Sequence, residues 1–259
     1  MNRRLPIVVI ALSIAASSVA LADVPGHLEG YLPTAARIDG LFGSVWTTDL
    51  WIYQQGAGTV HLWFNASDQD NTDVDSAVVT LEQPVTVLTD VVGSTFGTEG
   101  VGSIHYLADG PVVITSRTWT TADPSGSYGQ TIPGVPLADA AVPDSGQAGA
   151  LRMFVDQVAG FRTNLGVTNV SGVATTVAVD IFTAGGEPAP GASSFTLDLP
   201  PYGMTQVNGV LERLGPGDRH GLIVRVGVIS DEGAVTAYTS TVDNTTNDAS
   251  YQQGSRFAY

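Results

Sequence analysis

The segment Trp46-Thr47-Thr48-Asp49-Leu50-Trp51-Ile52 reads against Phe161-Arg162-Thr163-Asn164-Leu165-Gly166-Val167, which lies 115 positions later in the chain. Both segments carry an aromatic residue, a threonine, an aspartate or asparagine and a leucine in the same order. Two more colinear matches follow, Thr86 to Val92 with Thr205 to Leu211 and Ser127 to Gln130 with Ser250 to Gln253. The matches predict duplication of a domain of about a hundred residues, far longer than the repeats of solenoid proteins.

Short alternating segments separated by turn residues dominate both halves of the sequence. Period-two alternation predicts strands over residues 59–64, 77–81, 111–119, 176–182, 194–199, 222–228 and 234–242. Glycine-rich segments such as Gln54 to Gly58 and Asp231 to Gly233 read as turns. We therefore expect an all-β chain with two tandem antiparallel β-sandwich domains, at residues 23–136 and 148–259, joined by a linker at 137–147.

The N-terminus has the pattern of an export signal. Met1-Asn2-Arg3-Arg4 is basic, Leu5 to Ala20 is apolar, and Ala20-Leu21-Ala22 is a small-x-small cleavage site. We expect residues 1–22 to be a cleaved signal peptide, with an uncleaved anchor or a buried helix as the alternative. This predicts a secreted protein, either extracellular or periplasmic.

Composition restricts the classes of partner. The formal net charge is −15, and every basic side chain other than histidine is an arginine. Nucleic acids and anionic membranes draw their affinity largely from Lys and Arg. We therefore expect no nucleic-acid partner and no membrane insertion of the mature chain. The chain has no cysteine, which excludes disulfides, thiol nucleophiles and thiolate zinc sites.

Several motifs give the chain a family resemblance. They are Trp46-x-Thr48-Asp49-Leu50, Ser116-Arg117-Thr118-Trp119 and Gly126 to Pro133 in the first copy, and Phe161 to Asn169, Leu199 to Gln206 and Ala237 to Asp248 in the second. With these motifs the chain resembles the tandem Ig-like modules of uncharacterised exported bacterial proteins. The resemblance covers nearly the whole mature chain and implies two Ig-like sandwiches. It implies no activity and no catalytic or binding residues.

A search for catalytic motifs finds none. There is no Gly-x-Ser-x-Gly elbow and no His-Glu-x-x-His, and the four histidines, His27, His61, His105 and His220, lack metal-ligand spacing. The exchange of Asp49 for uncharged Asn164 between the copies suggests a shared structural hydrogen bond at a strand end. We expect no enzyme, no catalytic residues and no cofactor.

One acidic loop, Asp68 to Asp75, resembles a cation-binding segment. Asn71, Asp73, Asp75 and Glu82 copy the spacing of positions 1, 3, 5 and 12 of an EF-hand loop. Position 6, however, is Ser76 rather than glycine, and strand alternation begins at Ala77. The expectation is a solvated hairpin tip whose Asp and Asn side chains form local turns, with no metal site; a calcium loop remains the alternative.

The two copies differ in their outward-facing residues. Alternation places Thr48, Leu50, Ile52, Val60, Leu62 and Phe64 toward the core of the first copy. Trp51, Tyr53, His61 and Trp63 then point outward, where the second copy has Gly166, Thr168, Ala178 and Asp180. If the two strands pair as a hairpin, these four aromatic side chains form one exposed patch. Such patches usually mark contact surfaces.

These observations favour a secreted, non-catalytic adhesion, surface-display or scaffold protein that contacts its partner through Trp51, Tyr53, His61 and Trp63. The alternative is a carbohydrate-binding accessory protein that uses the same patch to bind a polysaccharide, and a hydrolase ranks third. The second domain, or the segment from Val24 to Ile38, is an alternative occupant of the patch within the same chain.

Overall fold

The computed structural model describes residues 26–40, 44–123, 126–143 and 149–256. The predicted signal peptide at residues 1–22 lies outside this described part of the chain. Strands make up 62% of the structure and helices 5%, which confirms the all-β prediction. Within the described residues, no helix is both long and apolar enough to cross a lipid bilayer.

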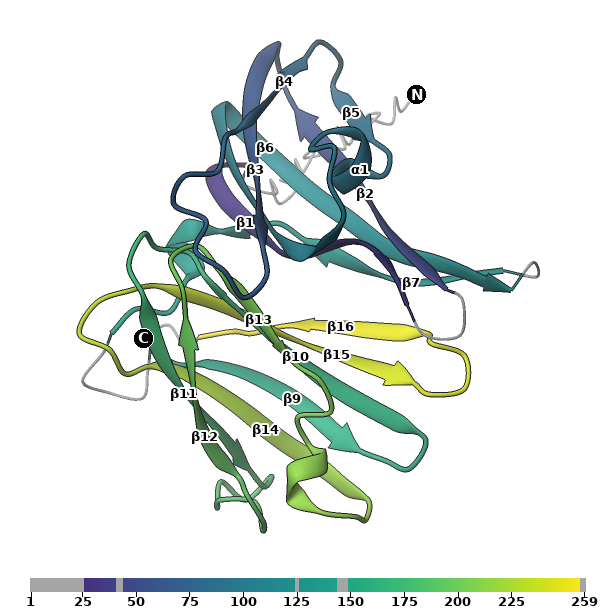
Figure 1. Cartoon of the computed structure of the whole chain (residues 1–259). Helices are drawn as coiled ribbons and strands as arrows, with labels where there is room; N and C mark the ends of the chain where they lie inside the picture. Colours follow the sequence, from purple (N-terminus) through teal and green to yellow (C-terminus); the bar gives the residue numbers. More distant parts are fainter. Residues whose placement is uncertain (1–25, 41–43, 124–125, 144–148, 257–259) are drawn as a thin grey trace, which may run out of the picture.

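The first half forms one antiparallel sheet that curls into a nearly closed cylinder of strands (Figure 1). Its strands are β1 (His27–Asp39), β2 (Val45–Gln54), β3 (Gly58–Ala66), β4 (Ala77–Leu81), β5 (Val85–Leu88), β6 (Gly100–Asp123), β7 (Gly126–Pro133) and β8 (Val135–Pro136). The N-terminal part of β6 pairs with β1 and β3, and its C-terminal part pairs with β2 and β7. This one strand therefore joins the layer β4-β3-β6-β1 to the layer β5-β2-β6-β7.

The second half packs two separate four-stranded antiparallel sheets face to face. One sheet has the order β13-β10-β15-β16 and the other β12-β11-β14-β9. Their bounds are β9 (Leu151–Gln157), β10 (Phe161–Asn169), β11 (Thr175–Phe182), β12 (Ser194–Leu199), β13 (Met204–Val207), β14 (Arg219–Val228), β15 (Val235–Asp243) and β16 (Ala249–Gln253). Among the described residues, short helices are formed by α1 (Val91–Ser94), η2 (Leu137–Asp139) and η4 (Glu212–Leu214).

The two halves pair their strands in the same order, as duplication of one unit would produce. Strands β1 to β5 correspond to β9 to β13, the two parts of β6 correspond to β14 and β15, and β7 corresponds to β16. The register agrees as well, because Leu50 pairs with Leu88 in the first copy and Leu165 pairs with Val207 in the second. The β14–β15 connection in the second copy is thus absent from the first, where β6 continues without a break.

One of the three sequence matches is out of register. Thr118 pairs with Gln130 in the first copy, and the equivalent Thr241 pairs with Ser250 in the second. Ser250 therefore corresponds to Gln130 and not to Ser127, so the predicted match was wrong by three residues. An odd shift exchanges the two faces of a strand, and Tyr128 and Tyr251 consequently have no structural equivalence.

Each half has its own hydrophobic core. The predicted inward residues Thr48, Leu50, Ile52, Val60, Leu62 and Phe64 are all buried, as their alternation requires. In the second half, Leu165 and Val167 of β10 meet Val177, Val179 and Ile181 of β11 across the sandwich. Burial of each such aliphatic side chain stabilises the fold by about 2 kcal/mol relative to exposure.

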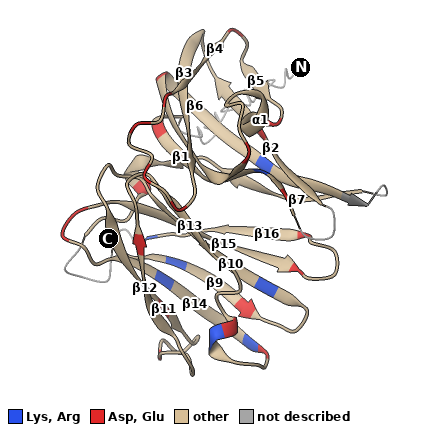
Figure 2. Cartoon of the chain, viewed as in Figure 1, with Lys and Arg blue, Asp and Glu red and all other residues tan. Residues whose placement is uncertain are grey.

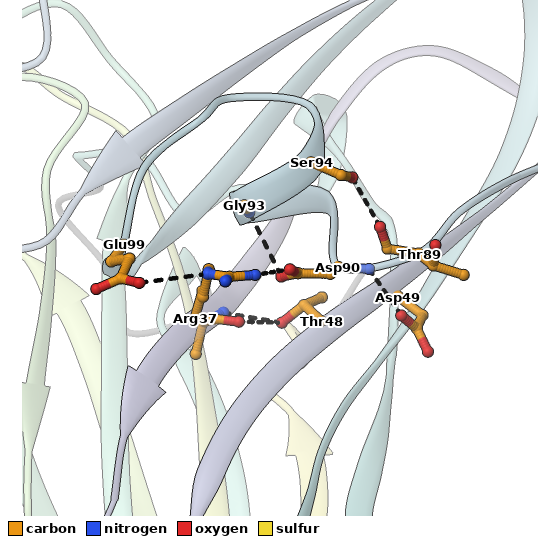
Figure 3. A network of polar contacts seen from close by, with 9 residues as sticks. Arg37, Thr48, Asp49, Thr89, Asp90, Gly93, Ser94 and Glu99 are labelled. Carbon is orange, nitrogen blue, oxygen red and sulfur yellow. Dashed lines mark hydrogen bonds and ion pairs between the residues drawn. The ribbon is translucent and has the colours of Figure 1, made fainter.

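A shared hydrogen bond supports the loop after β5 and after β13. In the first copy, the backbone N–H of Asp90 donates to Asp49 Oδ1 at 2.8 Å (Figure 3). In the second, the N–H of Gly209 donates to Asn164 Oδ1 at 3.1 Å. Asp90 and Gly209 are equivalent and both adopt positive φ angles, 48° and 58°. The suggested structural role of the Asp49 and Asn164 pair is therefore confirmed.

Asp90 also anchors the segment between β5 and β6. Its side chain accepts from the N–H of Gly93 at the start of α1 and forms an ion pair with Arg37 of β1 (Figure 3). Arg37 lies within 3.5 Å of Glu99 as well. The loop is thus fixed to the edge of the first layer by its own acidic residues.

The two halves contact each other over the outer face of the β13-β10-β15-β16 sheet. Thr168 donates to the carbonyl of Pro33 at 3.1 Å, and Ser240 donates to Gln130 Oε1 at 2.8 Å. Tyr251 of β16 packs against the hydrophobic core of the first half. In the described part of the predicted linker, residues 137–143, Ala141 pairs with Val235. The described part of the predicted linker is therefore attached to β15 of the second half at Ala141.

Candidate functional site

The structure separates the four predicted contact residues into two pairs. Strand β2 pairs with β1, β5 and β6, whereas β3 pairs with β4 and β6, so the assumed β2–β3 hairpin was wrong. The Gln55-Gly56-Ala57 turn carries the chain from one layer to the other. His61 and Trp63 therefore lie on the outer face of the first layer, and Trp51 and Tyr53 lie on the outer face of the second.

His61 and Trp63 belong to a row of stacked rings that crosses three strands. Tyr31 of β1 and His105 of β6 stack with centroids 4.5 Å apart, and His105 stacks on Trp63 of β3 at 4.8 Å. His61 continues the row at 5.9 Å from Trp63. Tyr31, His105 and Trp63 are direct cross-strand neighbours, which brings the rings within stacking distance. We call Tyr31, His105, Trp63 and His61 the aromatic ladder.

The ladder runs from the seam between the halves toward solvent. The Tyr31 ring is buried, and its hydroxyl donates to the carbonyl of Val170 in the second half. Burial raises the pKa of this phenol well above its usual value. At the other end, His61 is half-buried. Its cross-strand neighbours, Val78 on β4 and Leu107 on β6, are exposed. The segment from Val24 to Ile38, considered as a cover for the patch, instead supplies β1 and Tyr31.

One carboxylate holds the centre of the ladder. His105 Nε2 lies 2.9 Å from Glu29 Oε1, and Glu29 is the next outward residue along β1 from Tyr31. Burial lowers the pKa of His105 below its usual value, and the hydrogen bond to Glu29 partly opposes that shift. His105 is therefore neutral at pH 7 and stacks as an uncharged ring.

The lowered pKa of His105 predicts a pH dependence of stability. The unfolded histidine takes up a proton near pH 6.5, before the folded one does, so the free energy of unfolding falls as pH drops through that value. We expect the melting temperature to decline between pH 7.5 and pH 5, and to decline less in His105→Phe, which keeps the ring and removes the titration. Parallel declines in the two proteins would contradict this assignment.

The second copy replaces the ladder with charged side chains. Asp180 and Arg225 occupy the positions of Trp63 and His105 and form an ion pair of 2.7 Å. Arg152 occupies the position of Tyr31, and Ala178 that of His61. Figure 2 shows that most of the arginines lie in the second half. The ladder is thus specific to the first copy on an otherwise repeated framework.

Trp51 and Tyr53 lie beside aliphatic side chains on the other layer. Trp51 is flanked across β5 and β6 by Val87 and Thr115. Tyr53 is 46% exposed and borders a hollow of about 460 Å³ that is also lined by Gln55, Asp109 and Pro111. These two predicted contact residues therefore belong to a separate surface.

The acidic loop contacts the second half of the chain. The Asn71 side chain is buried and bonds to the backbone of Ala66 and Gln69, and the backbone N–H of Asn71 donates to the carbonyl of Pro201. Asp68 accepts a hydrogen bond from the Thr205 hydroxyl at 2.7 Å. Among the described residues, no three His, Cys, Asp or Glu side chains are placed to hold a metal ion. The loop therefore joins the two halves, which the hairpin-tip prediction did not anticipate.

The aromatic ladder offers stacked rings and one hydrogen-bonded pair, His105 and Glu29, which suit contact with another molecule. In the described residues, Glu29 is the one side chain hydrogen-bonded to His105, and both faces of the imidazole are covered by rings. Tyr31, His105 and Glu29 were absent from the predicted contact residues, because no strand was predicted over residues 27–39 and the strand that contains His105 was predicted only from Pro111. Alignment of residues 104–108 with 224–228 carries the missing signal, an exchange of His105 for Arg225.

Comparison with known proteins gives no family for the chain. No protein-family model matches it, and a search of curated proteins finds no relative.

Proposed function

We propose that this chain is an exported, non-catalytic adhesion, surface-display or scaffold protein made of two Ig-like modules, and that the aromatic ladder is its contact surface. The ladder carries the proposal, because the two halves share their strand pairing while this row holds aromatic rings in the first half and charged side chains at most of the same positions in the second. The shared strand order and the two packed layers in each half support the Ig-like assignment. The leader pattern of residues 1–22 supports export.

Ring orientation favours a protein partner over a sugar. A pyranose ring stacks on an open aromatic face, but the faces of Trp63 are flanked by His61 and His105. The ladder therefore presents ring edges together with exposed Val78 and Leu107. Trp51 lies on the opposite layer and cannot extend the same platform. A mixed surface of aromatic edges and aliphatic side chains resembles the centre of protein interfaces.

Replacement of Trp63 is expected to weaken binding to the cell surface strongly. The purified chain should be retained on intact producing cells, and Trp63→Ala should bind at least about 30-fold more weakly, because a central tryptophan commonly contributes 2 kcal/mol or more. Retention is measured by flow cytometry with labelled protein. Absence of retention, or equal retention of both proteins, would overturn the proposed function.

Two controls test whether the binding is specific to the aromatic ladder and whether the partner is a protein. Trp51→Ala makes the same chemical change on the opposite layer and should leave retention unchanged, provided its thermal melt shows a folded protein. Treatment of the cells with protease should remove the binding if the partner is a protein. Loss of binding after periodate oxidation of surface glycans, with protease having no effect, would instead support the carbohydrate-binding alternative.

A further inference from the structure

The contact between the two halves has two distinct sides. The second half contributes the outward residues of β10, β13, β15 and β16, among them Asn164, Gly166, Gln206, Tyr238 and Tyr251. The first half contributes the inward residues at its open end, among them Thr34, Ala36, Trp46, Thr118 and Gln130. The two sides enclose a hollow of about 500 Å³. We call the surface contributed by the second half the docking face. We call the surface contributed by the first half the receiving edge.

Because the chain is duplicated, the docking face has a counterpart in the first half. Strand equivalence places this free docking face on the outer side of β5-β2-β6-β7, with the residues Asp49, Trp51, Tyr53, Val85, Val87, Thr115, Arg117 and Trp119. Trp51 stands where the docking face has Gly166, and Val87 where it has Gln206. Val85 and Val87 are each 49% exposed. The counterpart is therefore open to solvent and carries its apolar side chains at other positions, since Thr115 and Thr131 stand where the docking face has Tyr238 and Tyr251.

The receiving edge likewise has a counterpart at the open end of the second half. Strand equivalence places Val155, Phe161, Gly221 and Thr241 at the positions of Thr34, Trp46, Val101 and Thr118. These four residues and Phe154 line a hollow of about 400 Å³. Phe154 and Phe161 are 57% and 49% exposed. We call this surface the free receiving edge.

The charges of the two free surfaces are complementary. Arg117 lies on the free docking face, with its guanidinium 5.8 Å from the Trp119 ring centroid. Three carboxylates, Asp156, Glu212 and Asp218, and one arginine, Arg162, line a second hollow that shares Phe161 with the free receiving edge, so its net charge is negative. The carboxylate of Asp49, also on the free docking face, already accepts from the N–H of Asp90 and from Trp119 Nε1.

We propose that a second copy of this chain places its free docking face against the free receiving edge, repeating between molecules the contact made within each molecule. Each free surface occupies the position of a surface that is covered inside the chain, and each carries exposed apolar side chains, Val85 and Val87 on one and Phe154 and Phe161 on the other. Burial of such surfaces favours association. The contact is heterologous, so copies would assemble head to tail into a ring or an open filament. This inference does not depend on the aromatic ladder.

Sedimentation velocity tests the proposal directly. The purified, processed chain should form species larger than a dimer as its concentration rises from micromolar to millimolar. Val87→Asp on the free docking face and Phe161→Asp on the free receiving edge should each be monomeric. An equimolar mixture of the two variants should give a dimer and nothing larger, because one intact surface of each kind remains for a single contact.

Controls separate this outcome from misfolding and from other assemblies. Val78→Asp introduces the same charge at an exposed valine of β4, in the layer that carries the aromatic ladder, and this variant should assemble like the wild type. Trp63→Ala should assemble like the wild type as well. Tyr53→Arg and Phe154→Asp replace any variant whose thermal melt shows unfolding. A wild-type chain that stays monomeric throughout would overturn the proposal. A wild-type dimer that the variant mixture fails to restore would overturn it too, since that result indicates a face-to-face contact.

Discussion

Tyr251→Ala is expected to lower the free energy of unfolding by about 2 to 3 kcal/mol, less than the loss of a fully buried aromatic side chain, because the ring is partly buried. Tyr251 belongs to the second half, yet its ring packs against the first hydrophobic core and stacks on Tyr238 with centroids 5.3 Å apart. Its hydroxyl also donates to Gln253. Loss of this ring removes an apolar anchor between the halves, so we expect unfolding in urea to separate into two transitions.

Tyr53→Ala is the matched control for that experiment. It removes the same side chain from an exposed site on the other layer of the first half, where the cost should stay below about 1 kcal/mol. Tryptophan fluorescence reports on the first half alone, because all four tryptophans lie there. Far-ultraviolet circular dichroism reports on both halves. Coincident transitions by the two methods in Tyr251→Ala would show that the tyrosine does not couple the halves.

Gly166→Ala is expected to destabilise the protein by about 3 kcal/mol, at the upper end of overpacking effects. A Cβ atom at this position would lie 2.0 Å from Cε1 of Tyr238. Tyr238 is fully buried, and its hydroxyl donates to Gln206 Oε1 at 3.1 Å. The ring can move away from this Cβ only by giving up its hydrogen bond to Gln206 and its stacking on Tyr251. The melting temperature should fall by about 6 to 12 °C.

Gly227→Ala provides the comparison for this glycine. Gly227 also lies inside a strand, β14, but the nearest atom to its added Cβ would be 3.6 Å away. An alanine that fits should be neutral or should stabilise the protein by about 0.5 kcal/mol, because it restricts the unfolded chain. Equal losses in the two variants would mean that strand position, and not the Tyr238 ring, sets the cost at Gly166.

The sequence was sufficient to predict the repeat and the inward faces. Alternation reports which side of a strand is buried, and Leu50 and Leu165 proved equivalent in pairing as well as in sequence. The Asp49 and Asn164 exchange was informative because both side chains accept from the same backbone N–H position. The backbone N–H requires an oxygen acceptor at this position. Aspartate and asparagine both provide that oxygen, so the residue can change its charge without losing the hydrogen bond.

The neighbours of each strand could not be predicted in the same way. A turn such as Gln55-Gly56-Ala57 has the same composition whether it closes a hairpin or crosses between layers, so Trp51 and Trp63 were wrongly placed on one surface. Strand β6 was read as starting at Pro111, because Gly100, Gly102 and Gly110 resemble turn residues. His105 lies on the part of β6 that was not predicted. The sequence therefore predicted two members of the aromatic ladder, His61 and Trp63, but not His105 or Tyr31.

The uninterrupted β6 strand also bears on where each copy tolerates added sequence. In the second copy, residues 229–234 connect β14 to β15 outside both sheets, and Ile229 is exposed. Extra residues at such a loop tip leave the neighbouring ladders intact. An insertion within residues 115–120 of β6 would instead fall inside a strand that is paired on both sides and would displace its register with β2 and β7. The loop at residues 229–234 is accordingly the site at which a foreign epitope could be grafted and displayed.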